Sequence, residues 1–177
     1  RDSEALRRAF LYHPPYYHFE EQATNYVDFG PQNSRGFRAL KVWLALQQAG
    51  ASGYRRMIGD DIALSRAMAD AVAAHPELEL VTQDLSIATF RYVPADLRGN
   101  DSDAAHEYLD ALNRALLGAL QRGGEVFVSN AVVAGRYVLR ACIVNFHTSL
   151  TDVQAVPDIV VRTGAPLDRK MRAASQL

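Results

Sequence analysis

The sequence has little of several features that would assign a protein to a class directly. Its 177 residues include one cysteine, Cys142, which cannot form a disulfide within the chain. The formal net charge is −1 and no basic run or stripe occurs, which argues against nucleic acid as the main partner. Wholly apolar runs extend over only a few residues, so no transmembrane helix is expected. The single cysteine fits a reducing, cytoplasmic location.

The common catalytic and metal-binding motifs are also missing. The chain has no GxGxxG, P-loop, GxSxG or HExxH sequence. Its five histidines are scattered, and His13 and His18 lie in a segment that prolines interrupt. We therefore expect no metal site. Cys142 lies in an apolar, strand-like stretch, and we expect it to be an unreactive core residue.

What the sequence does contain is a long segment without a period, followed by a strongly apolar one. Residues 11–33 include three prolines and no sustained repeat, which predicts a loop. A loop of this length inside a compact domain is usually a functional lid or disordered. The segment that follows is apolar nearly all round, which predicts a helix buried on most sides. We expect Ser34 or Asn33 to cap this helix and Gly50 to end it.

The rest of the chain predicts a second helix and then a small mixed domain. The helix is expected from about Ser52 to His75. The order β-β-α-β-β-α follows, with strands in 77–82, 85–94 and 125–145, a helix over 104–120, a turn at residues 134–136, and a last helix capped by Thr151. This order predicts an α/β chain whose second half is an α+β domain, with an antiparallel sheet and helices on one face. The first half lacks strands for a core of its own and must pack on something else.

Two places in the chain admit more than one chemical interpretation. The stretch NSRGFRALKVW is either a capped core helix or an anion site, because free N–H groups at a helix start attract phosphate or carboxylate. Arg140 is a charge within an apolar strand. It fits an edge position or a salt bridge, and it equally fits a residue that grips a ligand carboxylate.

Several stretches together carry a family resemblance. The most specific, at residues 25–58, reads NYVDFGPQNSRGFRALKVWLALQQAGASGYRRMI. RDSEALRRAFLYHPPYY precedes it, and HPELELVTQDLSIATFRYVPADL and YVLRACIVNFHTSLTDV follow in order. These stretches resemble group II pyridoxal-phosphate-dependent decarboxylases, the family of aromatic-L-amino-acid, tyrosine, histidine and glutamate decarboxylases. The resemblance spans nearly the whole chain and is nearer to the aromatic decarboxylases.

The resemblance implies a fold and an activity. The fold would be α/β of the PLP-dependent transferase type (fold type I), in its C-terminal part. Residues 1–75 would end the large domain and contain a mobile catalytic loop at about 11–33, and residues 76–177 would form the small α+β domain. The activity would be removal of the α-carboxylate of an aromatic amino acid, with pyridoxal 5'-phosphate as cofactor. The enzyme would be a homodimer with active sites at the interface.

Three residues match family positions, and a fourth, His18, lies in the expected loop. Tyr26 matches a loop tyrosine that protonates the substrate carbon after CO2 leaves. Ser34 matches a position that approaches the cofactor phosphate across the dimer interface. Arg140 matches an arginine near the substrate, where it would bind the α-carboxylate. His18 would touch the substrate from the loop.

One departure from the family concerns the cofactor lysine, which follows a histidine and precedes a tryptophan. The chain has only two lysines, Lys41 and Lys170, and neither has these neighbours. The resemblance places the true lysine upstream of Arg1, so we expect the chain to work with an N-terminal portion of the same enzyme. The alternative is a non-catalytic α/β regulatory or scaffold module that retains the fold and the dimer surface.

Overall fold

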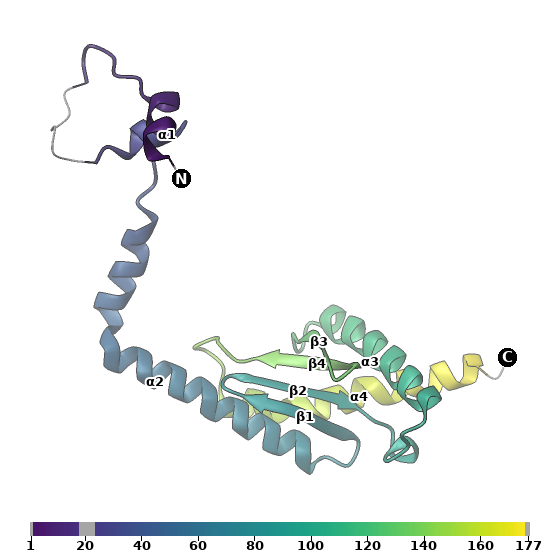
Figure 1. Ribbon diagram of the computed structural model, residues 1–177. Coiled ribbons are helices and arrows are strands. Elements are labelled where there is room, and N and C mark those ends of the chain that lie inside the picture. The colour runs from purple at the N-terminus through teal and green to yellow at the C-terminus, as the bar shows by residue number, and fades with distance from the viewer. Residues whose placement is uncertain (1, 18–23, 176–177) are drawn as a thin grey trace. The chain divides into compact units, whose positions relative to one another are not determined.

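The computed structural model describes residues 2–17 and 24–175. The elements, in chain order, are α1 (Ser3–Phe10), the 3-10 helix η1 (Tyr26–Phe29), α2 (Arg38–Ala74), β1 (Leu78–Asp84), β2 (Ile87–Tyr92), the 3-10 helix η2 (Ala95–Leu97), α3 (Asp103–Gly123), β3 (Ser129–Val133), β4 (Arg136–Cys142) and α4 (Leu150–Ser175) (Figure 1). The chain divides into two compact units, Arg1–Gly50 and Ala51–Leu177, and each is described by itself. The division of an intact enzyme into domains at residue 75 stays a prediction.

Gly50 interrupts α2, as the sequence predicted. Its φ of 62° and ψ of 174° are not helical and favour a residue without a Cβ atom. The capping prediction was wrong, because α2 begins at Arg38 and not directly after Ser34. Gly36, a poor helix former, lies between the two, which accounts for the later start.

The segment from Phe37 to Leu46 was expected to be buried. In this chain its apolar side chains are exposed: Phe37 72%, Val42 62%, Trp43 56% and Leu44 51%.

A four-stranded antiparallel sheet organises the second unit, as expected. The strand order is β1-β2-β4-β3, so β2 and β4 are central. Ala134 and Gly135 form the β3–β4 turn, with φ values of 49° and 78° that match a tight hairpin. Central strands with covered faces are apolar, and β2 and β4 are buried over most of their length.

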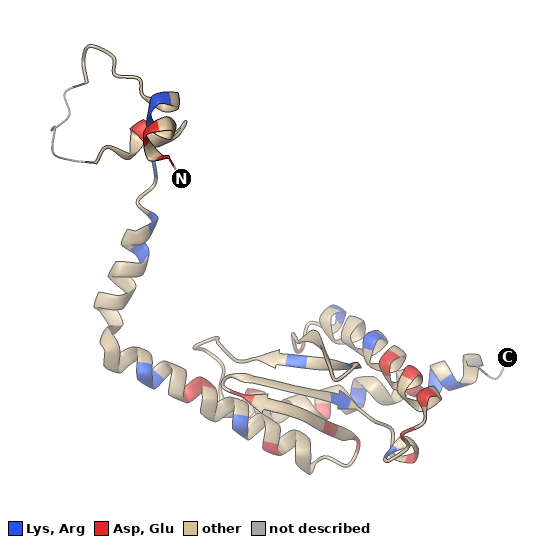
Figure 2. Cartoon of the chain, in the orientation of Figure 1, with Lys and Arg blue, Asp and Glu red and all other residues tan. Residues whose placement is uncertain are grey.

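The sheet shares one core with the second segment of α2, with α3 and with α4. The largest side chains of this core are fully buried, and they include Met68, Phe90, Tyr92, Leu112, Leu116, Leu139 and Val160. Apolar residues recur in α3 at helical spacing, which is why that helix presents one face to the core. Figure 2 shows charged residues at intervals along the same helix.

Two predictions about local structure were wrong. The cap of α4 is Ser149, not Thr151: Asp152 N–H donates to Ser149 Oγ (3.3 Å) and Ser149 N–H donates to Asp152 Oδ2 (2.8 Å). This reciprocal pair satisfies two free N–H groups at the helix start. Cys142 is exposed rather than buried, because alternation at the end of β4 places Ala141 and Ile143 inside.

Two negative findings hold for the part of the chain that the structure describes. None of its helices is both long and apolar enough to cross a membrane. No three His, Cys, Asp or Glu side chains in it come together as a metal site.

Two helical glycines are predicted to respond to substitution in opposite ways, because one lies at a close contact between α4 and β2 and the other does not. A Cβ atom on Gly164 would lie 2.8 Å from Cδ1 of Tyr92, a fully buried ring. We expect Gly164→Ala to lower the free energy of unfolding by about 1–3 kcal/mol through overpacking. The matched control is Gly59→Ala in α2, where a Cβ atom meets nothing within 4 Å. Removing a helical glycine should raise stability there by about 0.5–1 kcal/mol. Urea unfolding followed by circular dichroism measures both, and equal effects would contradict the contact.

The packing of α3 on α4 predicts a loss of stability at alkaline pH. Burial raises the pKa of Tyr108 to about 12, and the hydrogen bond from its hydroxyl to Asp168 Oδ1 (2.7 Å) acts in the same direction. Below pH 10 the hydroxyl is protonated in both states, so its contribution is fully present. Between pH 10 and about 12 the unfolded state ionises first, and the contribution is lost. Tyr108→Phe should flatten this fall in urea unfolding at a series of pH values. An unchanged slope would refute the assignment.

Candidate functional site

A buried carboxylate attaches the turn that carries Tyr26 to α1. The Asp28 side chain is only 6% exposed. His13 Nε2 lies 2.8 Å from Asp28 Oδ1, and Arg7 Nε lies 3.6 Å from Asp28 Oδ2. A buried carboxylate requires such partners; Arg7 links η1 to α1, and His13 links it to the segment that follows α1. This cluster could not be predicted from the sequence, because no periodic spacing links residues that meet only through a loop.

Tyr26 is the first residue of η1, and its side chain is 71% exposed. The backbone of η1 is therefore fixed through Asp28, while the phenol extends outward. A phenol in this position can approach a reacting atom that lies outside the unit Arg1–Gly50. His18, the other loop residue that the sequence singled out, lies outside the described residues.

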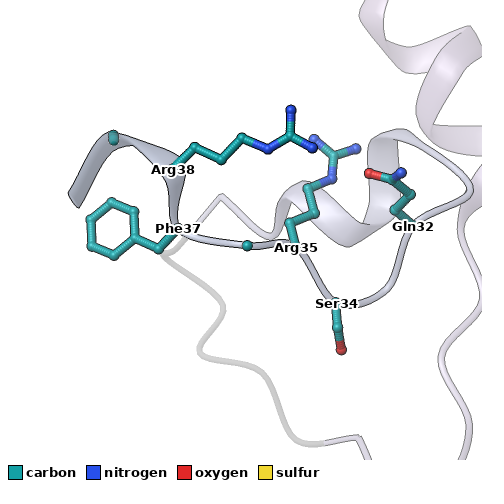
Figure 3. Close-up of a pocket in the computed structure, with 7 residues that line it drawn as sticks. Gln32, Ser34, Arg35, Phe37 and Arg38 are labelled. Carbon is teal, nitrogen blue, oxygen red and sulfur yellow. The ribbon is translucent and has the colours of Figure 1, made fainter. Parts of the chain in front are cut away.

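The segment before α2 forms an open hollow lined by donors. Its lining residues are Gln32, Ser34, Arg35, Gly36, Phe37, Arg38 and Ala39. Figure 3 shows the guanidinium ends of Arg35 and Arg38 and the amide of Gln32 directed to one side of the segment. The Ser34 hydroxyl points to the other side. Ser34 is among the lining residues of this hollow, at the stretch for which an anion site was one of two interpretations, but Arg35 and Arg38 supply the charge.

Backbone geometry helps to place Arg35. A Cβ atom on Gly30 would lie 2.9 Å from Arg35 Nη2, so the glycine leaves room for the guanidinium. Two guanidinium groups beside a helix start are the donors that a phosphate group prefers.

This donor set fits one end of pyridoxal phosphate. Arg35, Arg38 and Gln32 could hold the phosphate group from one side of the segment, whereas the Ser34 hydroxyl points to the other side. The lining residues that the structure describes include no lysine and no carboxylate, so they offer neither a covalent attachment nor a partner for the pyridine nitrogen. Lys41 lies along α2 and Lys170 along α4, and both are exposed.

Arg140 lies in the other compact unit, on β4. Because β4 is a central strand, the edge interpretation was wrong. In the described part of the chain Arg140 has no ion pair; its Nη1 donates to Ser129 Oγ at 3.5 Å. Its side chain is half-buried. The charge thus remains available for a carboxylate from outside the strand. Tyr26 and Ser34 belong to Arg1–Gly50 and Arg140 to Ala51–Leu177.

Known proteins match this chain by sequence and by structure. The profile described as "Pyridoxal-dependent decarboxylase conserved domain" matches residues 1–93. Tyrosine decarboxylase 2 of Arabidopsis thaliana is 34% identical over 145 residues, which is 79% of this chain and 25% of the relative. An aromatic-L-amino-acid decarboxylase of Bacillus atrophaeus is 28% identical over 158 residues, covering 86% of this chain and 32% of the relative. The chain therefore spans between a quarter and a third of these relatives.

Solved structures share the fold. TDC of Oryza sativa, determined with PLP and tryptamine, superposes with a TM-score of 0.70 at 24% identity, covering 94% of this chain and 34% of that one. Mouse CSAD in the apo form superposes with a TM-score of 0.73 at 22% identity, covering 93% and 35%. The α/β fold expected from the sequence is confirmed. Because the family profile covers more than half of the residues and a relative above 30% identity covers most of them, this chain belongs to the family of pyridoxal-dependent decarboxylases.

Proposed function

We propose that this chain is the C-terminal portion of a cytoplasmic, pyridoxal-phosphate-dependent decarboxylase of aromatic L-amino acids. The enzyme would remove the α-carboxylate as CO2 and leave an amine. The relatives named as tyrosine and aromatic-L-amino-acid decarboxylases support the substrate class. Residues 1–75 would belong to the large domain and residues 76–177 to the small one.

Tyr26 would deliver the proton that replaces the lost carboxylate. The observation that carries this role is an exposed phenol on a turn whose backbone is held by the buried Asp28. Pyridoxal phosphate, when bound, supplies the electron sink that makes loss of CO2 feasible. The chain must then place one proton donor near the substrate carbon and keep water away, and a phenol presented by a loop can do both.

The hollow before α2 would receive the phosphate group of the cofactor. Ser34 would contact it, and the guanidinium groups of Arg35 and Arg38 would neutralise its charge. Figure 3 shows the two guanidinium groups on one side of the segment and the Ser34 hydroxyl on the other, so a contact from Ser34 to the same phosphate would require its side chain to turn.

Arg140 and His18 would bind the substrate. A half-buried guanidinium with no carboxylate partner among the described residues can pair with the α-carboxylate of an amino acid. His18 would contact the substrate from the loop, as the family resemblance implies.

Further parts of the enzyme, outside this chain, would complete the active site. The exposed apolar side chains of Phe37, Val42 and Trp43 form a surface that water does not favour. We propose that the N-terminal portion of the enzyme, which carries the cofactor lysine, covers this surface, and that the active sites lie at the interface of a homodimer.

The test is to produce the chain together with the polypeptide that carries a His-Lys-Trp sequence. We expect a visible absorbance band from bound cofactor and release of CO2 from L-tyrosine or L-tryptophan, with L-glutamate as the comparison substrate. Cofactor binding without release of CO2 from any amino acid would favour the non-catalytic module. No absorbance band with added cofactor would overturn the catalytic proposal.

A further inference from the structure

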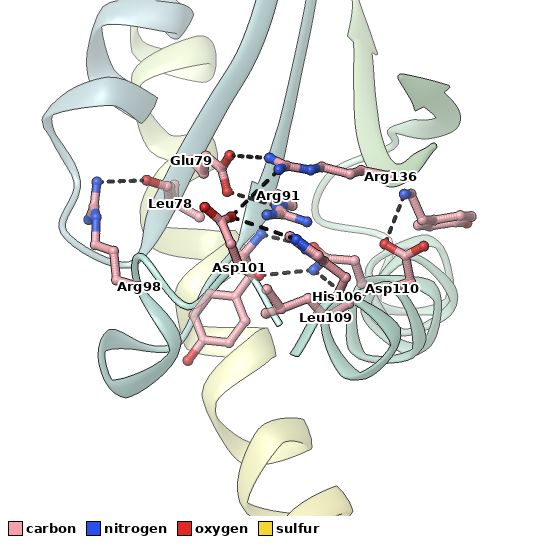
Figure 4. Close-up of polar contacts among 12 residues, drawn as sticks. Leu78, Glu79, Arg91, Arg98, Asp101, His106, Leu109, Asp110 and Arg136 are labelled. Carbon is pink, nitrogen blue, oxygen red and sulfur yellow. Dashed lines mark hydrogen bonds and ion pairs between the residues drawn. The ribbon is translucent and has the colours of Figure 1, made fainter. Parts of the chain in front are cut away.

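A small polar hollow lies in the second unit, among β1, β2, β4 and the loop between η2 and α3. Its volume is about 140 Å³, and Glu79, Arg91, Arg98, Asp101 and Arg136 are among its lining residues. This volume is roughly the share of four or five water molecules, which is room for an ion with few heavy atoms. Figure 4 shows Arg91 and Arg136 converging on Glu79.

Arg91 has an N–H donor group for which the described residues provide no acceptor. Its side chain is 4% exposed, and it faces Glu79 across the β1–β2 pair. Nε donates to Glu79 Oε2 at 2.8 Å. Nη1 is buried and meets no acceptor among the residues that the structure describes. A buried guanidinium N–H without an acceptor is costly, and natural proteins nearly always satisfy it.

The hollow carries an excess of positive charge. Three arginines line it against two carboxylates. Glu79 is shared, since its Oε1 also lies 3.4 Å from Arg136 Nη1. Arg98 donates to the carbonyl oxygens of Pro76 and Leu78, which are neutral. One positive charge is therefore uncompensated within the lining.

Asp101 lies at the solvent-exposed edge of the hollow and makes only long contacts there. It is 85% exposed, and its Oδ1 lies 3.7 Å from Arg136 Nη2 and 3.7 Å from His106 Nε2, beyond hydrogen-bonding distance. Exposed pairs of this kind contribute little and are easily displaced. The Asp101 carboxylate thus lies where an external anion would compete for Arg136.

We infer that this hollow binds a small oxyanion of the phosphate or carboxylate class, which accepts hydrogen bonds from Arg91 Nη1 and from Arg136. The site is separate from the residues assigned to decarboxylation and does not depend on that proposal. Guanidinium groups suit oxyanions because several N–H groups can point at one ligand.

The test uses the full chain, labelled with nitrogen-15, and two probes at low ionic strength and pH 7. Inorganic phosphate and acetate are titrated separately while backbone amide shifts are recorded. We expect saturable shifts at residues 99–101 and at Arg91. Tighter binding of phosphate than of acetate would assign the phosphate class, and the reverse order would assign the carboxylate class. The absence of saturable shifts with both probes would overturn the inference and leave water as the occupant.

Three variants make the test specific. Arg136→Gln should weaken binding about ten-fold, because one charge-assisted contact is lost. Asp101→Asn should tighten binding several-fold, because the competing carboxylate is gone. Arg162→Gln, which breaks an exposed pair with Glu125 elsewhere on this unit, should leave affinity unchanged. Arg91 is kept, since its loss would leave Glu79 without its closest partner. Equal affinity in Arg136→Gln and the wild type would refute the site.

Discussion

Tyr26→Phe should reduce amine formation by about 10²–10⁴-fold in the assembled enzyme, the usual contribution of a positioned general acid. The substitution removes one oxygen atom from a side chain that is 71% exposed, so the free energy of unfolding should not change. Cofactor absorbance should also persist, because the contacts proposed for the phosphate group lie at Gln32–Arg38 in the adjoining segment. The measurement is steady-state turnover with an aromatic amino acid, and KM should change far less than kcat.

The matched control for this prediction is Tyr12→Phe. Tyr12 is 77% exposed and belongs to the same segment of the chain, but no role is assigned to its hydroxyl. Wild-type turnover in Tyr12→Phe, together with the loss in Tyr26→Phe, would isolate the proton donor. Unchanged turnover in Tyr26→Phe would refute the assignment.

Asn113→Leu should lower the free energy of unfolding by roughly 2–5 kcal/mol, because two buried backbone groups lose their partners. Asn113 is fully buried in α3. Its Oδ1 accepts from Tyr92 N–H at 2.8 Å, and its Nδ2 donates to the Tyr92 carbonyl at 2.9 Å. The β2–β4 pairing ends at Phe90 and Leu139, so the amide side chain takes the place of a missing strand residue.

The control for this prediction is the same exchange at an exposed site. Asn130 lies on the edge strand β3 and is exposed, so Asn130→Leu should change stability by no more than about 0.5 kcal/mol. Urea unfolding of both variants, followed by far-UV circular dichroism, gives the comparison. A loss below about 1 kcal/mol in Asn113→Leu would show that water or a neighbouring group satisfies Tyr92 instead.

The β1–β2 hairpin illustrates where sequence patterns stop being informative. Predicted strands at 77–82 and 85–94 leave only residues 83 and 84 for the turn. The observed strands extend to Asp84 and resume at Ile87, so Leu85 and Ser86 make the turn. Leu85 has a φ of 48°, a conformation that a branched residue rarely adopts, and no glycine or asparagine marks it. Pairing of Glu79 with Arg91 depends on this register and could not be read in advance.

The sequence indicated the candidate site in two ways. Family resemblance singled out Tyr26 and Ser34, and the free N–H groups expected at the helix start had already suggested an anion site around Ser34. Neither indicated Asp28, Arg35 or Arg38. Asp28 is buried and paired with His13. Its burial could not be predicted, because the loop has no periodic spacing of apolar residues that would show which side chains face inward. Arg35 and Arg38 matter because they share a hollow, which depends on the turn at residues 30–36.

By itself the sequence determined the order of the helices and strands, the antiparallel α+β half, the break at Gly50 and the family. These properties follow from the spacing of apolar residues, from turn residues and from motifs, all of which involve residues that are close together in the sequence. Only the tertiary structure decided which polar atoms meet, such as Asp28 with His13 or Glu79 with Arg91 and Arg136. It also decided that the apolar start of α2 is left exposed in this chain. The physical reason is that hydrogen bonds and burial depend on distances between residues remote in sequence, and strand register and packing set those distances.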